Sequence, residues 1–209
     1  MKLPSTAHTS RPWRIHDITR DFRLEDVWAL PTPGGPDDFS RLVQQFAEGD
    51  SSDNPSWVVH ALFAIRRRLG ALFNWDEPKS GIGSRVSSLR DRLPGDLCEG
   101  STGPQFTSRP LTSVYLTHDE WAAEVSNRTV HAVMHMGWVP DEAGGYRGQL
   151  AVLVKPNGLF GRAYMAAIAP FRHLLVYPSL MRSMGRQWRE GMSEEPVDPA
   201  PTNHPTDPS

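Results

Sequence analysis

The chain has 209 residues, of which 38% are hydrophobic and 22% charged, and its formal net charge is -2 at pH 7. This length is sufficient for one domain with a substantial hydrophobic core. A net charge near zero gives no overall attraction to nucleic acid or to anionic membranes, so the sequence predicts no nucleic-acid partner.

The N-terminal part predicts a loose segment followed by two short strands. Residues 1–10 are polar and aperiodic, and they lack the apolar core of a signal peptide, so we expect a flexible N-terminus and a cytoplasmic protein. Short apolar runs at 13–15 and 26–30 are typical of strands, and the Pro- and Gly-rich residues 31–36 end the second of them.

Two helices are expected next. The first begins near Asp37 and ends near residue 48, and one side of it is apolar. A helix is also expected over residues 56–73, where apolar residues again recur on one stripe. No regular element is predicted over 74–110, which is rich in Gly, Pro, Ser and charge. The single Cys98 lies there without a Cys or His at metal-ligand spacing, and it cannot form an internal disulfide, which favours a reducing compartment.

The second half of the chain predicts an antiparallel sheet. Four strands are expected, over residues 112–117, 120–126, 129–139 and 146–155. Residues 127–128 form a two-residue turn in this prediction, and residues 141–145 form the turn before the last strand.

One long amphipathic helix is predicted over residues 157–190. Its apolar residues recur at spacings of three and four, and Pro170 and Pro178 are expected to kink it. The polar pair Arg172-His173 interrupts the apolar run, so a transmembrane span is not expected. Residues 190–209 are rich in proline and predict a disordered tail, which leaves 11–189 as a single domain.

A two-residue turn at 127–128 predicts the register of the hairpin. Glu124 then lies opposite His131, and Glu120 lies opposite His135. These four residues share one face with Ala122 and Val133, and the other face is apolar. Glu124 and His131 could form an acid/base pair, or the Glu and His residues could be weak ion contacts on the solvent face of a one-sided sheet.

Known catalytic and cofactor motifs are not found. His131 and His135 are four residues apart on a strand, which separates their Cα atoms by about 13 Å and is too far for one metal ion. The sequence has no dinucleotide-binding glycine motif, no nucleophile elbow and no paired CxxC. We therefore predict no metal site and no cofactor.

Three segments resemble an uncharacterised bacterial family of the START-like superfamily. They are SSLRDRLPGDL at 87–97, YLTHDEWAAEVSNRTVHAVMHMGWV at 115–139 and GQLAVLVKPNGLFGRAYMAAIAPFRHLLVYP at 148–178. In that family the domain occurs alone or behind a short-chain dehydrogenase-like domain. The resemblance implies an α+β helix-grip fold, with a curved antiparallel sheet wrapped around the C-terminal helix and two shorter helices after the first strand. It also implies a cavity between sheet and helix, usually for an apolar or amphipathic molecule, and it supplies no catalytic residues.

The main functional hypothesis is binding of a small hydrophobic or amphipathic molecule, for carriage, sensing or sequestration. The expected lining combines one sheet face with one helix stripe, although these side chains could equally fill a packed core. The lining residues are Trp121, Val125, Met134, Met136, Trp138, Phe160, Tyr164, Ile168 and Phe171.

Two other functions stay open. The first is a cofactor-independent, polyketide-cyclase-like enzyme that uses Glu124, His131 or Tyr164 inside the cavity. The second is a non-catalytic interaction or membrane-peripheral module that uses the apolar helix. The sequence identifies neither the ligand nor the oligomeric state.

Overall fold

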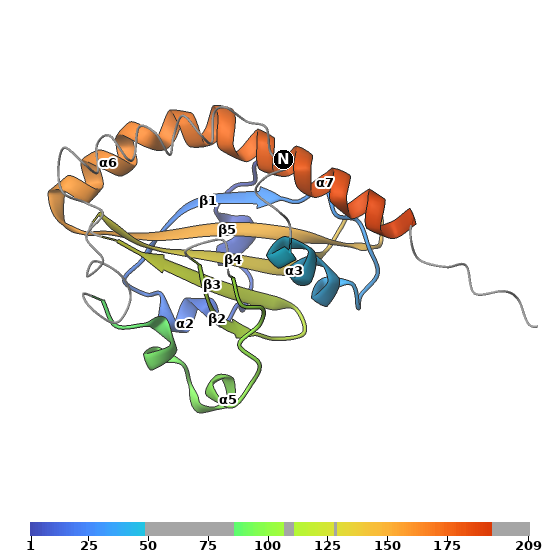
Figure 1. Ribbon diagram of the computed structural model, residues 1–209, viewed down its shortest axis with the longest axis horizontal. Helices are drawn as coiled ribbons and strands as arrows, with labels where there is room; N and C mark the ends of the chain where they lie inside the picture. Colours follow the sequence, from blue (N-terminus) through green and yellow to red (C-terminus); the bar gives the residue numbers. More distant parts are fainter. Residues whose placement is uncertain (49–85, 107–110, 128, 194–209) are drawn as a thin grey trace, which may run out of the picture.

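The protein is an α+β structure built on one open, curved antiparallel sheet (Figure 1). The computed structural model describes residues 1–48, 86–106, 111–127 and 129–193. Five strands pair in the order β1-β5-β4-β3-β2. Their bounds are Arg23–Ala29 for β1, Thr112–Leu116 for β2, Glu120–Ser126 for β3, Val130–Pro140 for β4 and Tyr146–Pro156 for β5.

The strands of the second half confirm the prediction to within two residues, because apolar and polar residues alternate along them. The strand expected at 13–15 is wrong. Ile15 begins the short helix α2, Ile15–Ile18, which places Ile15 and Ile18 on one buried side. The expectation of a loose segment at 1–10 also differs from the structure, since α1 spans Thr6–Thr9 and the Leu3 amide donates to the Val27 carbonyl at 2.8 Å.

Helix α3, Phe39–Glu48, confirms the first predicted helix, and its buried residues are Phe39, Leu42, Val43 and Phe46. The helix expected over 56–73 lies outside the described residues. Within 74–110, where no element was predicted, the structure contains the 3₁₀ turn η2, Leu89–Arg92, and the short helix α5, Gly95–Cys98.

The C-terminal helix arches along the whole sheet (Figure 1). It consists of α6, Gly158–Phe171, a π-helical segment η3, Arg172–Val176, and α7, Tyr177–Ser193. Pro178 has no N–H for the Leu174 carbonyl and its ring crowds that carbonyl, so a wider turn directly before the proline relieves the clash. Among the helices that the structure describes, none combines the length and the apolar character of a membrane span.

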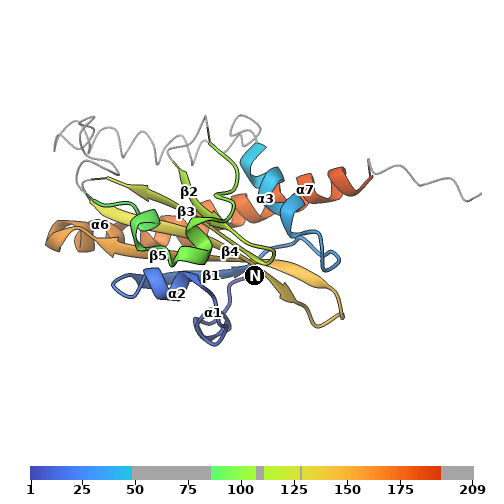
Figure 2. The same ribbon diagram turned by 90° about the horizontal axis from the view of Figure 1, so that it is seen from below.

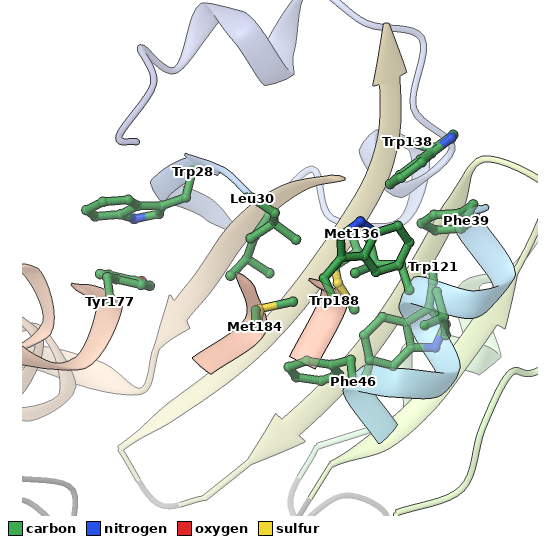
Figure 3. Packing of buried hydrophobic residues seen from close by; sticks show 14 residues of the cluster. Trp28, Leu30, Phe39, Phe46, Trp121, Met136, Trp138, Tyr177, Met184 and Trp188 are labelled. Atoms are coloured by element: carbon green, nitrogen blue, oxygen red, sulfur yellow. The ribbon is translucent and has the colours of Figure 1, made fainter. Parts of the chain in front are cut away.

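The sheet face beneath this helix carries the largest apolar cluster (Figure 3). Trp188 of α7 has its ring centroid 6.2 Å from that of Trp138, and Trp138 is also 6.2 Å from Phe39 of α3. The prediction that the apolar hairpin face meets the C-terminal helix is therefore confirmed. The cluster contains Trp28, Leu30, Phe39, Leu42, Val43, Phe46, Trp121, Ala123, Met136, Trp138, Leu150, Tyr177, Met184 and Trp188.

The opposite face of the sheet is also buried, which corrects the expectation of a solvent face. Helix α2 and the η2–α5 segment cover it, as Figure 2 shows for α2 and for the green η2–α5 segment, and His8 of α1 contacts His135 of β4. Trp13 lies directly on Gly137 of β4, where an added Cβ would come within 2.6 Å of the indole ring. Both faces of the sheet are therefore covered, and the polar residues of this second face lie in the interior of the protein.

Candidate functional site

The hairpin of β3 and β4 has a register two residues away from the predicted one. Ser126 lies opposite His131, and Ala122 lies opposite His135. The side chain of Asn127 accepts hydrogen bonds from the amides of Thr129 and Val130, which makes the turn longer than two residues. Because side chains alternate with period two, this shift leaves every residue on its predicted face. The Glu and His residues therefore still meet, along diagonals of the sheet.

Glu124 and His131 form a fully buried pair. His131 Nε2 lies 2.7 Å from Glu124 Oε2, and the exposed fractions of the two residues are 1% and 0%. Ser88 donates to Oε1 at 2.6 Å, and the Leu89 amide also faces the carboxylate. Burial by itself raises the pKa of Glu124, but the hydrogen bonds from His131, Ser88 and Leu89 outweigh it and lower the pKa. The carboxylate thus fixes η2 to the sheet.

Glu120 anchors a second buried network. Its Oε2 receives hydrogen bonds from His135 Nε2 and from the Tyr115 hydroxyl, both at 2.9 Å. Its Oε1 receives one from the Arg14 amide, also at 2.9 Å. His135 Nδ1 in turn lies 3.1 Å from Nε2 of His8 in α1. The network therefore joins the N-terminal segment to the start of β3 and the middle of β4.

The pKa shifts in this network indicate which groups are protonated. Burial raises the pKa of Glu120, but the hydrogen bonds from His135, the Arg14 amide and Tyr115 outweigh it, so the net pKa is lowered and the carboxylate is ionised. Burial lowers the pKa of His135 and, assisted by the charges of His135 and His16, lowers that of His8 to about 3. Two neutral imidazoles then donate in series, from His8 to His135 and from His135 to Glu120.

We expect acid to destabilise the fold through this network. The pKa of His8 is lower in the folded chain than its ordinary 6.5, so the unfolded chain binds more protons as the pH falls below about 6.5. His8 alone should cost about 2 kcal/mol of unfolding free energy between pH 7 and pH 5. Urea denaturation at the two pH values measures this loss. His8→Gln should reduce the difference, and exposed His118→Gln should not; equal midpoints at both pH values would contradict the assignment.

The predicted ligand-lining residues divide into three groups. Trp121, Met136 and Trp138 are buried, and Trp138 Nε1 donates to the Gly35 carbonyl at 2.9 Å, so these residues belong to the packed cluster under α7. Val125, Met134 and Ile168 are only partly buried. The side chains of Phe160, Tyr164 and Phe171 lie outside the described part of the structure.

A polar cluster that the sequence reading did not predict lies under the C-terminal helix. Its centre is Asp26 of β1, whose side chain is fully buried. Tyr177 donates its hydroxyl to Oδ2 at 3.0 Å, and Arg172 lies 3.4 Å from the same oxygen. His173 Nε2 and Lys2 Nζ approach Oδ1 at 3.3 and 3.4 Å. Burial, followed by the charge of Asp26, raises the pKa of Tyr177, which is therefore a neutral donor.

The π-helical segment explains how these side chains converge. In an α-helix, residues five apart point about 140° away from each other, because each residue turns by about 100°. A π-helical turn bonds residue i to residue i+5, so Arg172 and Tyr177 lie near the same side. On β1, the pairing with β5 shifts between Leu24 and Asp26, which is a bulge of the kind that re-aims a side chain. The π-helical segment and the bulge in β1 therefore together bring these side chains to the Asp26 carboxylate.

The sheet register connects the polar cluster to apolar surface. Asp26 lies opposite Val152, Val152 lies opposite Met134, and Met134 lies opposite Ala123. Paired residues on neighbouring strands are about 5 Å apart, so these four form one row across the helix side of the sheet. Val152 and Met134 are partly exposed. The row therefore has a charged end and an apolar middle.

Two sequence features could have indicated the Asp26 cluster. Asp26 is the one acidic residue in the otherwise apolar strand segment DVWAL, and Arg172-His173 is the polar interruption of the apolar helix. By itself, Arg172-His173 indicates only that the helix does not span a membrane. Their pairing needs the fold, because 146 residues separate them.

This arrangement defines a class of α+β proteins in which a long C-terminal helix covers one face of an open five-stranded antiparallel sheet. The chain belongs to the family described as "Protein of unknown function (DUF2867)", which matches residues 18–179. The resemblance to an uncharacterised family is thus confirmed at this level. Neither the curated proteins nor the solved structures contain a match to the chain.

Proposed function

We propose that the chain binds a small hydrophobic or amphipathic molecule between the sheet and the C-terminal helix. The observation that carries this proposal is the row from Asp26 through Val152 to Met134, where apolar surface remains partly exposed beside a buried polar cluster. Apolar side chains between two packed layers are normally fully buried. A site of apolar surface with a few convergent polar groups is typical of small-molecule binding.

The surrounding clusters support the same location. Under α7 the sheet is packed by the tryptophan-rich cluster of Figure 3, and under α6 a smaller cluster contains Val130, Val154 and Met165. Met134, Val152 and Ile168 lie against these clusters and are only partly buried. The resemblance to START-like helix-grip proteins, whose ligands lie between the sheet and the last helix, favours the same place.

The catalytic alternative requires Glu124, His131 or Tyr164 beside this site. Glu124 and His131 lie on the other face of the sheet, fully buried against η2 and Phe22. Tyr164, the third candidate, has a side chain outside the described part. An enzymatic role therefore stays a prediction without support from Glu124 or His131.

Ligand binding is tested first by native mass spectrometry of freshly purified protein, which should detect a retained small molecule. Titration with the neutral dye Nile red should then show saturable binding. Met134→Gln should weaken dye binding about 10-fold, because it places a polar amide on the apolar row. Leu174→Gln, at an exposed position of the C-terminal helix, should leave dye binding unchanged. A wild-type protein that retains no molecule and binds no dye would refute the proposal.

A further inference from the structure

Three residues at the polar end of the row each carry a buried polar atom without a hydrogen-bond partner among the described residues. Among the described residues, none forms a hydrogen bond with Trp28 Nε1, Asp26 Oδ1 or Arg172 Nε. Lys2 and His173 lie within ion-pair distance of Asp26 Oδ1, but without hydrogen-bond geometry. Buried polar atoms are nearly always hydrogen-bonded, so three around one side chain indicate a site that receives a polar group.

Tyr177 and Arg172 connect the three residues. The centroid of its ring is 4.7 Å from that of Trp28, and its hydroxyl donates to Asp26. Arg172 in turn contacts Asp26 Oδ2 at 3.4 Å and Glu25 at 3.5 Å. Figure 3 shows Trp28 and Tyr177 side by side, away from the packed centre of the cluster.

The unpaired atoms specify what the polar group must do. Trp28 and Arg172 each offer an N–H, and Asp26 offers a carboxylate oxygen, so the group must accept from two donors and donate to one acceptor. A hydroxyl has two lone pairs and one O–H, which matches this requirement. An ether cannot donate to Asp26, and an ammonium cannot accept from Trp28 or Arg172.

The local charge favours a neutral group. The carboxylates of Asp26 and Glu25 face Arg172, Lys2 and His173, with exposed Arg23 beside Glu25. An additional anion would lie against a fully buried carboxylate, and an additional cation against a partly buried guanidinium. Each of these cations already lies within ion-pair distance of Asp26 or Glu25, so neither addition would gain an unused counter-charge to compensate for its loss of water.

We propose that Trp28, Asp26 and Arg172 bind the hydroxyl group of a neutral hydrophobic alcohol, whose apolar part lies along Val152 and Met134. Val152 is directly opposite Asp26, so the apolar part begins one strand away, at a backbone spacing of about 5 Å. This inference rests on the proposed function and specifies the chemical class of its ligand.

Displacement of Nile red by decyl compounds with different head groups tests the inference. The four probes are 1-decanol, decyl methyl ether, decanoate and decylammonium, which share one chain. We expect 1-decanol to displace the dye at a concentration about 10-fold lower than the other three. Trp28→Phe removes one donor and keeps an aromatic ring, so it should reduce the preference for 1-decanol about 3-fold or more while dye binding persists.

Trp13→Phe is the matched control, because Trp13 Nε1 also has no hydrogen-bond partner in the described part of the chain but lies on the opposite face of the sheet. It should leave the preference for 1-decanol unchanged, and circular dichroism verifies that both variants are folded. Equal displacement by all four probes, or the strongest displacement by decanoate, would overturn the hydroxyl site and leave the proposed function intact. An undiminished preference in Trp28→Phe would also overturn it. A wild-type protein that binds neither dye nor probe would refute both proposals.

Discussion

Replacing Glu120 by Ala is expected to lower the free energy of unfolding by about 3–5 kcal/mol, the cost of removing one partner from a buried charged network. The substitution leaves three donors facing a space without an acceptor: the Arg14 amide, the Tyr115 hydroxyl and His135 Nε2. None of the three can turn toward solvent, because the N-terminal segment covers this face. Urea denaturation at pH 7 measures the loss.

Two milder variants show whether the loss comes from the network. Tyr115→Phe removes one donor and leaves the carboxylate with its other two, so it should cost about 1 kcal/mol. Glu120→Gln keeps the volume of the side chain but introduces an N–H₂ group where only acceptors are needed, and its effect should lie between the other two. If Glu120→Ala lost no more than Tyr115→Phe, the carboxylate would not be the centre of the network.

Replacing Trp188 by Ala is the second substitution with a large expected effect, about 3–5 kcal/mol. The side chain is fully buried between α3, α7 and the sheet (Figure 3). Its Nε1 donates to the Pro33 carbonyl at 2.8 Å, and the Arg41 guanidinium lies 5.1 Å from its ring centroid. The substitution therefore removes a large apolar contact with Trp138 and the hydrogen bond to the Pro33 carbonyl.

Met192→Ala is the matched control for Trp188, since Met192 lies one turn further along α7 and is 50% exposed. It should change the free energy of unfolding by less than about 0.5 kcal/mol, as surface substitutions usually do. A thermal melt of both variants measures the contrast. Similar melting temperatures for the two would show that α7 contributes little to the stability of the core.

The strands and the division of the sheet into two faces were predictable because both depend on neighbouring residues. Alternation along 120–126 and 130–139 specifies which side chains share a face, whatever the register. The register itself was wrong by two residues, because it depends on how Asn127 bonds the turn. A register shift of two residues leaves each side chain on the same face, so the two Glu–His pairs still form although the predicted turn was wrong.

The burial of those pairs could not be predicted from the same pattern. Whether a polar sheet face meets water depends on what packs against it, and here the covering segments are distant in the chain: Ser88 lies 36 residues before Glu124, and the N-terminal segment lies more than 100 residues before the residues it covers. His8 meets His135 across a separation of 127 residues, and Arg14 meets Glu120 across 106. Local periodicity contains no information about such contacts.

The sequence by itself determined the α+β class, the four strands of the second half, helix α3 and the amphipathic C-terminal helix, because repeats of two or of three to four residues express which sides are buried. Only the tertiary structure decided that both sheet faces are covered and that Asp26 meets Arg172, His173 and Tyr177. The physical reason is that a buried carboxylate needs hydrogen-bond donors, whatever their distance in the sequence. Here Tyr177 donates from a helix about 150 residues further along the chain, and a π-helical segment turns that helix side toward the sheet.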